Sequence, residues 1–374
     1  MRKIAILDFS YTYGGVNQYT QSIVDAFQND KNNYYVIFCS TNETKYDNYN
    51  LEVRKIDIKE RFLTRIVRIF ELITRLRVLK LKNYNSFKDI DLIVSPIASV
   101  YPHIYLNIPF VFTLHDLQEE YYPQFFFKKE LFFRRLYNSR LCEKAESIIC
   151  ESNYVKNDII KFYKVAEDKI YIVESPPPNS FINSNILKSK NKTVIEKHKL
   201  PKEYLYYPAQ TWYHKNHINL LKAFRLLSTK YPQLFLILSG SKQNNHTNIL
   251  KYIKDHNLKV KHLGYIDYDD LPYIYTNSKM LVLPTLFESI SIPIWEAFSL
   301  GVPVCSSNAV ALPEQVGDAG ILFNPKDPND IFEKIKTLLD DSKQREKMII
   351  KGKDKVQKFN HENYCKKLLK VIDV

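Results

Sequence analysis

Short apolar runs alternate with segments of helical pattern along the whole chain, in two successive series. The first series comprises Ile4–Leu7, Tyr35–Cys39, Leu92–Pro96, Phe110–Leu114, Ser147–Cys150 and Ile170–Val173. The second comprises Leu205–Pro208, Leu234–Ser239, Val260–Leu263, Met280–Pro284, Val302–Ser306 and Ile321–Phe323. Strands that alternate with helices form βαβ units, whose strands pair in parallel under a cover of helices. The pattern therefore predicts an α/β protein with two Rossmann-like domains.

The two series are separated by a stretch that cannot continue either kind of element. It begins at Glu174-Ser-Pro-Pro-Pro-Asn-Ser180 and stays polar to about residue 199. Three consecutive prolines exclude a helix interior and a central strand. We therefore predict a first domain at residues 1–175, a linker at 176–199 and a second domain at 200–357. A length of 374 residues suits two domains that each bury their own core.

The chain carries 54 basic and 41 acidic residues, which gives a formal net charge of +13. Such a charge suits nucleic acid, anionic lipid or a phosphate-bearing small molecule, and a composition bias toward Lys, Asn, Ile and Tyr is an alternative source of part of it. No apolar stretch is long enough to span a bilayer, and the N-terminus reads as a strand, not as a signal peptide. Five cysteines without metal-like spacing predict reduced thiols in a cytoplasmic protein.

The most informative single segment is residues 287–304, which holds two glutamates with seven residues between them. Pro293 suits a first helical turn and Gly301 suits a helix end. Glu288 is therefore expected in a loop at the carboxyl end of a strand, and Glu296 about two turns into the next helix, within reach of the same crevice. The spacing alone is weak, because two solvated carboxylates would give the same letters.

This segment resembles the donor-site signature of retaining glycosyltransferases of the large GT4 family, which have the GT-B fold. The similarity continues through Ser307-Asn308, Leu312-Pro313-Glu314 and Gly317-Asp318-Ala319-Gly320, and it is strongest over residues 263–325. The resemblance implies two Rossmann-like domains around a deep interdomain cleft, the first for the acceptor and the second for a nucleotide sugar. It also implies that the last helix, about residues 358–374 with His361–Ile372 at its centre, packs back on the first domain.

In this family the first glutamate, here Glu288, contacts hydroxyls of the donor sugar, and the second, here Glu296, contacts the ribose. Carboxylates suit both tasks because they accept paired hydrogen bonds from neighbouring hydroxyls. The loop between them supplies amides to the diphosphate, and relatives commonly read Glu-Gly-Phe-Gly there. This chain has other residues at that loop, which put its geometry or donor preference in question: Ser289, Ile290, Ser291 and Ile292.

A basic pair usually follows the first strand of the second domain in this family. This chain keeps Lys215, which the resemblance assigns to the diphosphate leaving group. The earlier position, often Arg in relatives, holds Gln210 or Thr211, so a second cation is absent there unless His214 or a basic residue elsewhere takes its place. The resemblance names no nucleophile and implies no metal or other cofactor.

Three further loops are assigned to the donor by resemblance, and each has an ordinary turn as its alternative. Gly14 and Gly15 follow the first strand, where close backbone approach to a diphosphate is possible. Gly240 lies in a small-residue turn, and Tyr265 follows a strand near the expected nucleobase.

His115 ends the strand at 110–114, and the resemblance places it near the transferred sugar or the acceptor. The alternative is a satisfied histidine beside a helix-capping Asp116. Ser152-Asn153 suits the N-cap of the helix that follows it. The Asp-x-Asp spacings at residues 89–91 and 267–269 lie in turns, and we predict no metal there.

A strongly amphipathic helix is predicted at residues 61–75. Its basic face comprises Arg61, Arg65, Arg68 and Arg75, and its apolar face comprises Leu63, Ile66, Phe70 and Ile73. A second basic and aromatic stretch lies at residues 125–135. Two interpretations remain: the apolar face packs on the sheet and the basic face is solvated, or these elements hold the protein at an anionic membrane. No nucleic-acid motif or aromatic strand platform is present.

Taken together, the resemblance implies a retaining, metal-independent hexosyltransferase that acts in bacterial surface polysaccharide synthesis. The segment at 207–217 is most similar to bacterial mannosyltransferases, so GDP-mannose is expected before a UDP-sugar, with a glycan or lipid-linked acceptor. The expected location is the cytoplasm, with a peripheral position on the inner face of the plasma membrane. The alternatives are a GT-B nucleotide-sugar epimerase or hydrolase, and a non-catalytic basic protein that binds membrane or nucleic acid.

Overall fold

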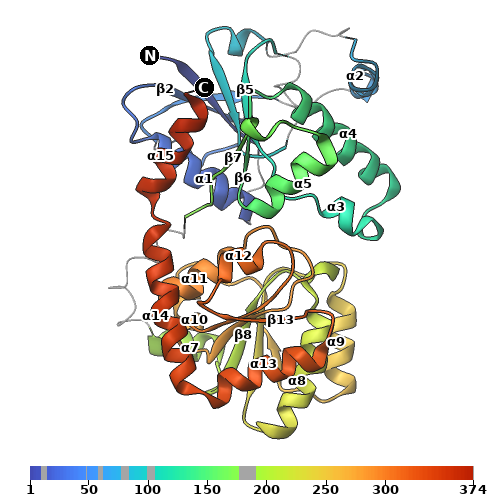
Figure 1. The fold of residues 1–374 in the computed structure, drawn as a ribbon, viewed down its shortest axis with the longest axis vertical. Helices are drawn as coiled ribbons and strands as arrows, with labels where there is room; N and C mark the ends of the chain where they lie inside the picture. The colour runs from blue at the N-terminus through green and yellow to red at the C-terminus, as the bar shows by residue number, and fades with distance from the viewer. Residues whose placement is uncertain are drawn as a thin grey trace. The chain divides into compact units, whose positions relative to one another are not determined.

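The computed structural model describes residues 1–9, 15–47, 49–57, 62–76, 84–98, 106–176 and 191–373. Contacts divide the chain into two compact units, which are described separately. The first unit comprises Met1–Ser175 together with His361–Val374, and the second comprises Pro176–Asn360. Each unit contains one parallel sheet with helices packed around it (Figure 1).

The first unit contains a seven-stranded parallel sheet of order β3-β2-β1-β4-β5-β6-β7. Its strands are β1 (Lys3–Asp8), β2 (Tyr34–Ser40), β3 (Glu52–Ile56), β4 (Leu92–Ser95), β5 (Phe110–Thr113), β6 (Ser147–Cys150) and β7 (Ile170–Ile172). All six apolar runs of the first series are strands, which confirms that part of the prediction. β3, an edge strand, was missed.

The helices of the first unit are α1 (Gly15–Phe27), α2 (Phe62–Thr74), α3 (Gln118–Tyr121), α4 (Lys128–Lys144), α5 (Asn153–Tyr163) and α15 (His361–Ile372). Short 3-10 turns lie at Tyr84–Phe87, Pro123–Phe125 and Glu167–Lys169. α15, the last helix of the chain, packs along α1 (Figure 1), where Tyr364 and Leu368 share a buried cluster with Tyr19 and Phe27. The C-terminal helix is therefore part of the core of the first unit.

The second unit contains a six-stranded parallel sheet of order β10-β9-β8-β11-β12-β13. Its strands are β8 (Tyr204–Pro208), β9 (Phe235–Ser239), β10 (Val260–His262), β11 (Met280–Leu283), β12 (Val304–Ser307) and β13 (Ile321–Phe323). Every strand predicted in the second series is present, so the expected architecture of two Rossmann-like α/β halves is confirmed.

The helices of the second unit are α7 (Asn191–His198), α8 (His217–Lys230), α9 (His246–Asp255), α10 (Leu271–Thr276), α11 (Ile292–Leu300), α12 (Leu312–Val316), α13 (Pro328–Asp340) and α14 (Ser342–Lys358), with a 3-10 turn at Tyr213–Lys215. α7 lies inside the segment predicted as linker, and both Lys197 and His198 bond to Asp270, at 2.7 and 2.8 Å. The last part of that segment is therefore a helix held on the second unit, and residues 177–190 lie outside the described ranges.

Helix boundaries follow from residues that satisfy the free backbone groups at each end. Ser152 caps α5 by accepting the amide of Val155 at 3.2 Å, as the sequence allowed. α11 has a proline in its first turn and ends at Gly301 in the left-handed conformation, with φ 68°. Both features of α11 were predicted, so its position after β11 was fixed by local sequence.

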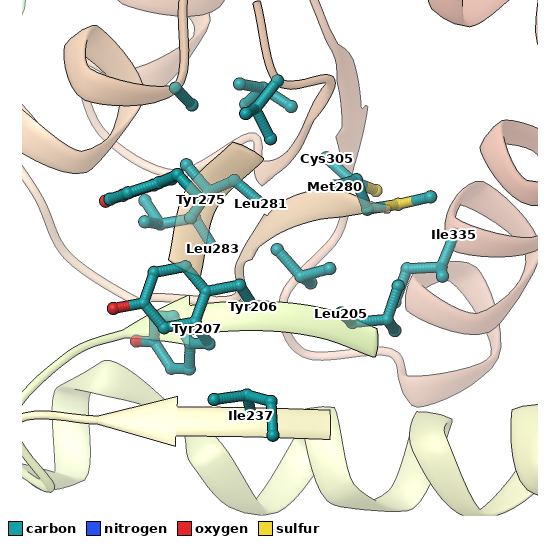
Figure 2. Packing of buried hydrophobic residues seen from close by; sticks show 14 of the residues in the cluster. Leu205, Tyr206, Tyr207, Ile237, Tyr275, Met280, Leu281, Leu283, Cys305 and Ile335 are labelled. Carbon is teal, nitrogen blue, oxygen red and sulfur yellow. The ribbon is translucent and has the colours of Figure 1, made fainter. Parts of the chain in front are cut away.

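The core of the second unit is built around β8, which is buried along most of its length. Figure 2 shows Leu205, Tyr206 and Tyr207 of this strand packed with side chains of β9, β11 and β12. A strand buried on both faces needs every residue to be apolar or internally bonded. The Tyr206 hydroxyl meets Ser239 Oγ at 2.8 Å, and the Tyr207 hydroxyl donates to the carbonyl of Lys215 at 2.7 Å. The core thus reaches the loop that follows β8.

Candidate active site

The strand order of the second sheet changes direction between β8 and β11. From β8 the chain builds outward through β9 to β10, and from β11 it builds the other way through β12 to β13. In open parallel sheets, ligands bind beyond the carboxyl ends of the two strands at such a switch point. The segments that leave these strands, residues 209–216 and 284–291, are therefore the first place to look for chemistry.

Backbone and buried side chains join these two segments directly. The carbonyl of His214 accepts the amide of Leu286 at 2.7 Å and the hydroxyl of Thr285 at 3.2 Å. Asn216, which is buried, donates through Nδ2 to the carbonyls of Pro284 and Pro325 at 2.8 and 2.7 Å. The loop after β8 is thus held against the loop after β11.

This junction brings together two of the residues predicted to be catalytic. Lys215 Nζ lies 2.5 Å from Glu288 Oε2. Both side chains are about one-fifth exposed, with values of 21% and 20%. An ion pair at this depth is screened less by salt than one on an open surface. The arrangement provides a cation that an anionic ligand can recruit and a carboxylate that hydroxyls can bond.

Asn216 allows a direct test of how the junction is held. Its backbone is left-handed, with φ 59°, a conformation that Asn tolerates better than most residues. We expect Asn216→Ala to lower the free energy of unfolding by about 2–4 kcal/mol, because two hydrogen bonds are lost and a strained backbone remains. Chemical denaturation measures the loss. Asn216→Gly keeps the backbone freedom and should lose less; equal losses in the two variants would show that backbone strain plays no part.

The loop between the two glutamates is fixed by α12. Gln315 of α12 accepts the amide of Ser291 at 2.8 Å and donates to the carbonyl of Ser291 at 2.8 Å. Ser289 and Ser291 are buried, and Ile292 is the first residue of α11. One of the loop amides expected to face a diphosphate is therefore already bonded to a side chain.

Glu296 is the fifth residue of α11, so it lies little more than one turn into the helix and not two turns as expected. Its carboxyl is buried, and Oε2 accepts a hydrogen bond from the Tyr275 hydroxyl at 2.6 Å. Burial disfavours the charged form and raises the pKa of Glu296 to about 7, although the bond from Tyr275 acts in the opposite direction. Tyr275 in turn stands edge-on to Tyr206, with ring centroids 4.9 Å apart, as the labelled rings in Figure 2 indicate.

A raised carboxyl pKa has a definite consequence for stability. The folded protein keeps the Glu296 proton up to about pH 7, whereas the unfolded chain releases it near 4.5, so stability falls as pH rises between these values. Glu296→Gln removes the titration. We expect its free energy of unfolding, relative to wild type, to rise by on the order of 3 kcal/mol from pH 4.5 to 8.

Thermal or chemical unfolding at several pH values measures this difference. Glu333→Gln, which changes an exposed carboxylate on α13 of the same unit, is the matched control and should stay parallel to wild type. Parallel curves for Glu296→Gln as well would contradict the assignment.

The remaining donor-side residues lie along the same carboxyl edge. Gln210 is exposed and accepts the Trp212 ring N–H at 2.8 Å, whereas Thr211 is buried, so Gln210 is the residue of the two that faces solvent. Gly240 has φ +119°, and a Cβ there would lie 2.6 Å from the carbonyl carbon of Ala209, so a side chain is excluded. Tyr265 is exposed beyond β10.

Several histidines surround this edge without adding charge. Burial, together with the charge of Lys215, lowers the pKa of His214 to about 3. Burial is also the main cause that lowers the pKa of His217 to about 3 and that of His262 to about 4. These rings are neutral at pH 7, so His214 does not supply the second cation that the sequence left open.

In the first unit, the corresponding switch point lies between β1 and β4. His115, just beyond the neighbouring strand β5, has two protein partners: Glu151 Oε2 at 2.9 Å and the Pro96 carbonyl at 3.0 Å. Asp116 Oδ1 accepts the amide of Gln118 at 3.1 Å, as a residue before a helix does. Gly15 is the first residue of α1, and Gly14 lies outside the described residues.

Matches to two protein-family models identify the families of these two units. A family model described as Glycosyltransferase Family 4 matches residues 13–176. A second, described as Glycosyl transferases group 1, matches residues 189–355. The chain belongs to these glycosyltransferase families.

Individual relatives agree with this assignment. The glycosyltransferase is 29% identical over 261 residues to O-antigen chain mannosyltransferase B of Escherichia coli, a match that covers 68% of this chain and 67% of the relative. It is 28% identical over 216 residues to the serotype-specific mannosyltransferase WbdA of Escherichia coli. This match covers 56% of this chain and 26% of WbdA. Anabaena HepE, solved in complex with UDP and glucose, superposes with a TM-score of 0.76 at 17% identity over 100% of both chains. The fold of the glycosyltransferase is therefore GT-B.

Four residues that support the site were not found from the sequence. Gln315 bonds Ser291, and Tyr275 bonds Glu296. Tyr207 bonds the carbonyl of Lys215, and Asn216 ties the loop of Lys215 to the carbonyl of Pro284. Asn216 follows Lys215 directly, and a buried Asn before a helix is a weak signal that could have drawn attention. The others belong to distant elements, and no local pattern marks them.

The Asp-x-Asp spacings are occupied by ion pairs in the glycosyltransferase. Asp89 pairs with Lys3 and Arg54, and Asp267 pairs with Lys197. Within the described ranges, no group of three or more His, Cys, Asp or Glu side chains is arranged to hold a metal ion. No helix in the described part of the chain has the length and apolarity needed to cross a bilayer.

Proposed function

We propose that this glycosyltransferase moves a sugar from a nucleotide-diphosphate sugar to a hydroxyl of a glycan or lipid-linked acceptor, with retention at the anomeric carbon. The donor is GDP-mannose first and a UDP-sugar next, and the pathway is synthesis of a bacterial surface polysaccharide. The observation that carries the proposal is the Lys215–Glu288 pair at the switch point between β8 and β11. The mannosyltransferase names of the O-antigen relatives support the choice of sugar.

In this proposal, the diphosphate of the donor takes Lys215 Nζ from Glu288. The ammonium then neutralises the charge that develops on the leaving group, and the N-terminus of α11 adds its partial positive charge. Because the Ser291 amide donates to Gln315, the amides of Ser289 and Ile290 are the ones assigned to the phosphates. Lys215 supplies the cation, so the proposal needs no metal and no other cofactor.

Release from Lys215 leaves the Glu288 carboxylate to accept hydrogen bonds from hydroxyls of the sugar. Glu296 is assigned to the ribose, where its second oxygen is available beside the one that Tyr275 bonds. His115 is assigned to the sugar or the acceptor on the side of the first unit. Gly14, Gly15, Gln210, Gly240 and Tyr265 are assigned to contacts with the nucleotide, and no residue is assigned as a nucleophile.

A ligand panel with matched variants tests this function. A nucleotide present at about 100 times its Kd should raise the free energy of unfolding of wild type by about 2.7 kcal/mol. We expect this rise for wild type with GDP and with GDP-mannose, and no rise for Glu296→Ala with either ligand. Transfer to an acceptor glycan should fall on the order of a hundredfold or more in kcat for Lys215→Ala, since a charge that stabilises the leaving group is lost.

Lys222→Ala is the matched control, because Lys222 is an exposed lysine of α8, the helix that follows Lys215. This variant should leave unchanged both the rise in the free energy of unfolding with nucleotide and the rate of sugar transfer. A rise in the free energy of unfolding with UDP or UDP-sugars alone would identify a UDP-sugar, and not GDP-mannose, as the donor. Consumption of the donor without an acceptor would favour an epimerase or hydrolase. No response to any nucleotide would reject the transferase proposal in favour of a binding protein.

The orientation of α2 supports contact with a membrane as part of the proposal. The sequence left open a helix packed by its apolar face with its arginines in solvent, and that interpretation is wrong. Ile66, Phe70 and Ile73 are exposed by 48%, 50% and 53%. Arg68 is instead buried, where it pairs with Glu71 at 3.1 Å. The side chains of Arg61 and Leu63 lie outside the described residues.

The polar side of α2 is held by α4. The guanidinium of Arg140 donates to the carbonyl of Leu72 at 2.7 and 2.6 Å, and Arg75 pairs with Glu143 at 3.3 Å. This anchoring directs the apolar stripe outward, with Arg65 exposed beside it. An apolar stripe flanked by basic residues suits the interface of an anionic membrane. A cytoplasmic enzyme held peripherally at the inner membrane face would meet a lipid-linked acceptor there.

Replacement of Ile66, Phe70 and Ile73 by serine together should weaken binding to vesicles of anionic phospholipid at least about tenfold, because the apolar area available for insertion is lost. Co-sedimentation measures binding. Transfer to a short soluble acceptor should be unchanged. Leu250→Ser, which alters an exposed apolar residue of α9 in the other unit, is the control and should bind like wild type. Equal binding by the triple variant would reject this surface.

A further inference from the structure

The strand register of the first sheet places His115 opposite Glu151. In the parallel pair of β5 and β6, Thr113 is the partner of Ile149. His115 and Glu151 each lie two residues further along, on the same face of the sheet because side chains alternate. Glu151 Oε2 approaches His115 Nδ1 at 2.9 Å, and Glu151 Oε1 accepts the hydroxyl of Ser175. Glu151 is buried, so its hydrogen-bond partners lie within the fold.

The partners of the ring fix the number of protons that it carries. Nε2 lies 3.0 Å from the carbonyl of Pro96, which can only accept a hydrogen bond, so Nε2 must donate. Nδ1 faces a carboxylate whose other oxygen already accepts from Ser175. A carboxylate accepts only, and beside a carboxylate Nδ1 donates as well. A ring that donates from both nitrogens is an imidazolium.

The surroundings favour the same state. Burial acts to lower the pKa of His115, but the hydrogen bond and charge of Glu151, with the charge of Asp116, outweigh it and raise the pKa above 6.5. Among the described residues, the other titratable groups that face the pair are the phenols of Tyr19 on α1 and Tyr364 on α15 and the thiol of Cys150. Burial raises the pKa of all three well above neutrality, to about 12 for Cys150.

We propose that Glu151 is a positioning residue that holds His115 as an imidazolium, so that His115 serves sugar transfer as a fixed cation and not as a base. The inference rests on the proposed function, because it concerns a histidine assigned to that reaction. The Tyr19 ring stands against the imidazole at 4.6 Å and 85°, which fixes the ring plane. A charge fixed before the ligand arrives suits electronegative oxygens of a phosphate or sugar, and it needs no rearrangement during the reaction.

Titration of the histidine ring by NMR on the full chain tests the charge without any substrate. The His115 signal is assigned as the one absent from His115→Gln. We expect wild-type His115 to titrate above pH 6.5, and the ring in Glu151→Gln to titrate below 6.5 and at least about one pH unit lower than in wild type, which is about tenfold weaker proton binding. Because the wild-type titration does not depend on Glu151→Gln, it decides the point even if that variant does not fold.

Kinetics test the use of the charge. Glu151→Gln should lower kcat on the order of tenfold or more at pH 8, with the KM for the donor nearly unchanged, and should recover toward wild type at pH 6 as the ring regains its proton. A purely structural role would give a loss that does not depend on pH. Glu174→Gln is the matched control, since Glu174 lies beside Ser175 and pairs with Lys367. It should change neither the titration nor kcat.

The outcomes separate this inference from the proposed function. Titration of wild-type His115 at or below 6.5, or an unchanged titration in Glu151→Gln, would overturn the assignment of charge. A lowered pKa with unchanged kcat at every pH would overturn its role in transfer. If wild type transfers no sugar in the donor panel, the proposed function fails on that result, while the ring titration still decides whether Glu151 sets the charge.

Discussion

The Lys215–Glu288 pair exists because β8 and β11 are neighbours whose onward connections run in opposite directions along the sheet. The two loops that leave these strands therefore lie next to each other, and the polar groups of each loop find hydrogen-bond partners in the other. The carbonyl of His214 accepts hydrogen bonds from the loop after β11, and the side-chain amide of Asn216 donates to a carbonyl of that loop. The Lys215–Glu288 ion pair joins the side chains of the two loops. The same carboxyl edge that the fold leaves open is thus held rigid by its own hydrogen bonds, which is what a site for a charged ligand requires.

Glu151 and Glu296 are buried and Glu288 is about one-fifth exposed, and each of these carboxylates is stabilised in a different way. Glu288 has a lysine, Glu151 has an imidazole and a hydroxyl, and Glu296 has a tyrosine hydroxyl. A buried carboxylate without a cation is costly, and the raised pKa of Glu296 is the sign of that cost. Tightly packed cores rarely retain such groups without a use, so the position of these carboxylates at the carboxyl ends of strands favours function over stability.

The sequence specified the strands well and their side-chain partners poorly. Buried parallel strands are continuous apolar runs, which is why twelve of them could be recognised, whereas β3 is a partly exposed edge strand with charged residues and gave no such run. For α2 the periodicity defined two faces but not which of them faces inward. Arg140 and Glu143 of α4 decide that, and they lie about seventy residues away. Glu288 and Lys215 were both expected at one edge, but Tyr275, Gln315 and Glu151 depend on contacts that no local pattern encodes.

The two glutamates of the seven-residue spacing look equivalent in the sequence, yet their surroundings make them different acids. Glu288 lies against an ammonium group, and a ligand that takes this cation changes the carboxylate from an ion-pair partner into an acceptor for hydroxyls. Glu296 lies among tyrosines with a pKa near neutrality, so it can bond a ribose hydroxyl either as acceptor or, when protonated, as donor. Groups of one chemical type whose environments push their protonation apart are characteristic of sites that divide a task. Under the proposed function, this division separates a carboxylate that pairs with the cation for the leaving group, Glu288, from one that bonds the ribose, Glu296.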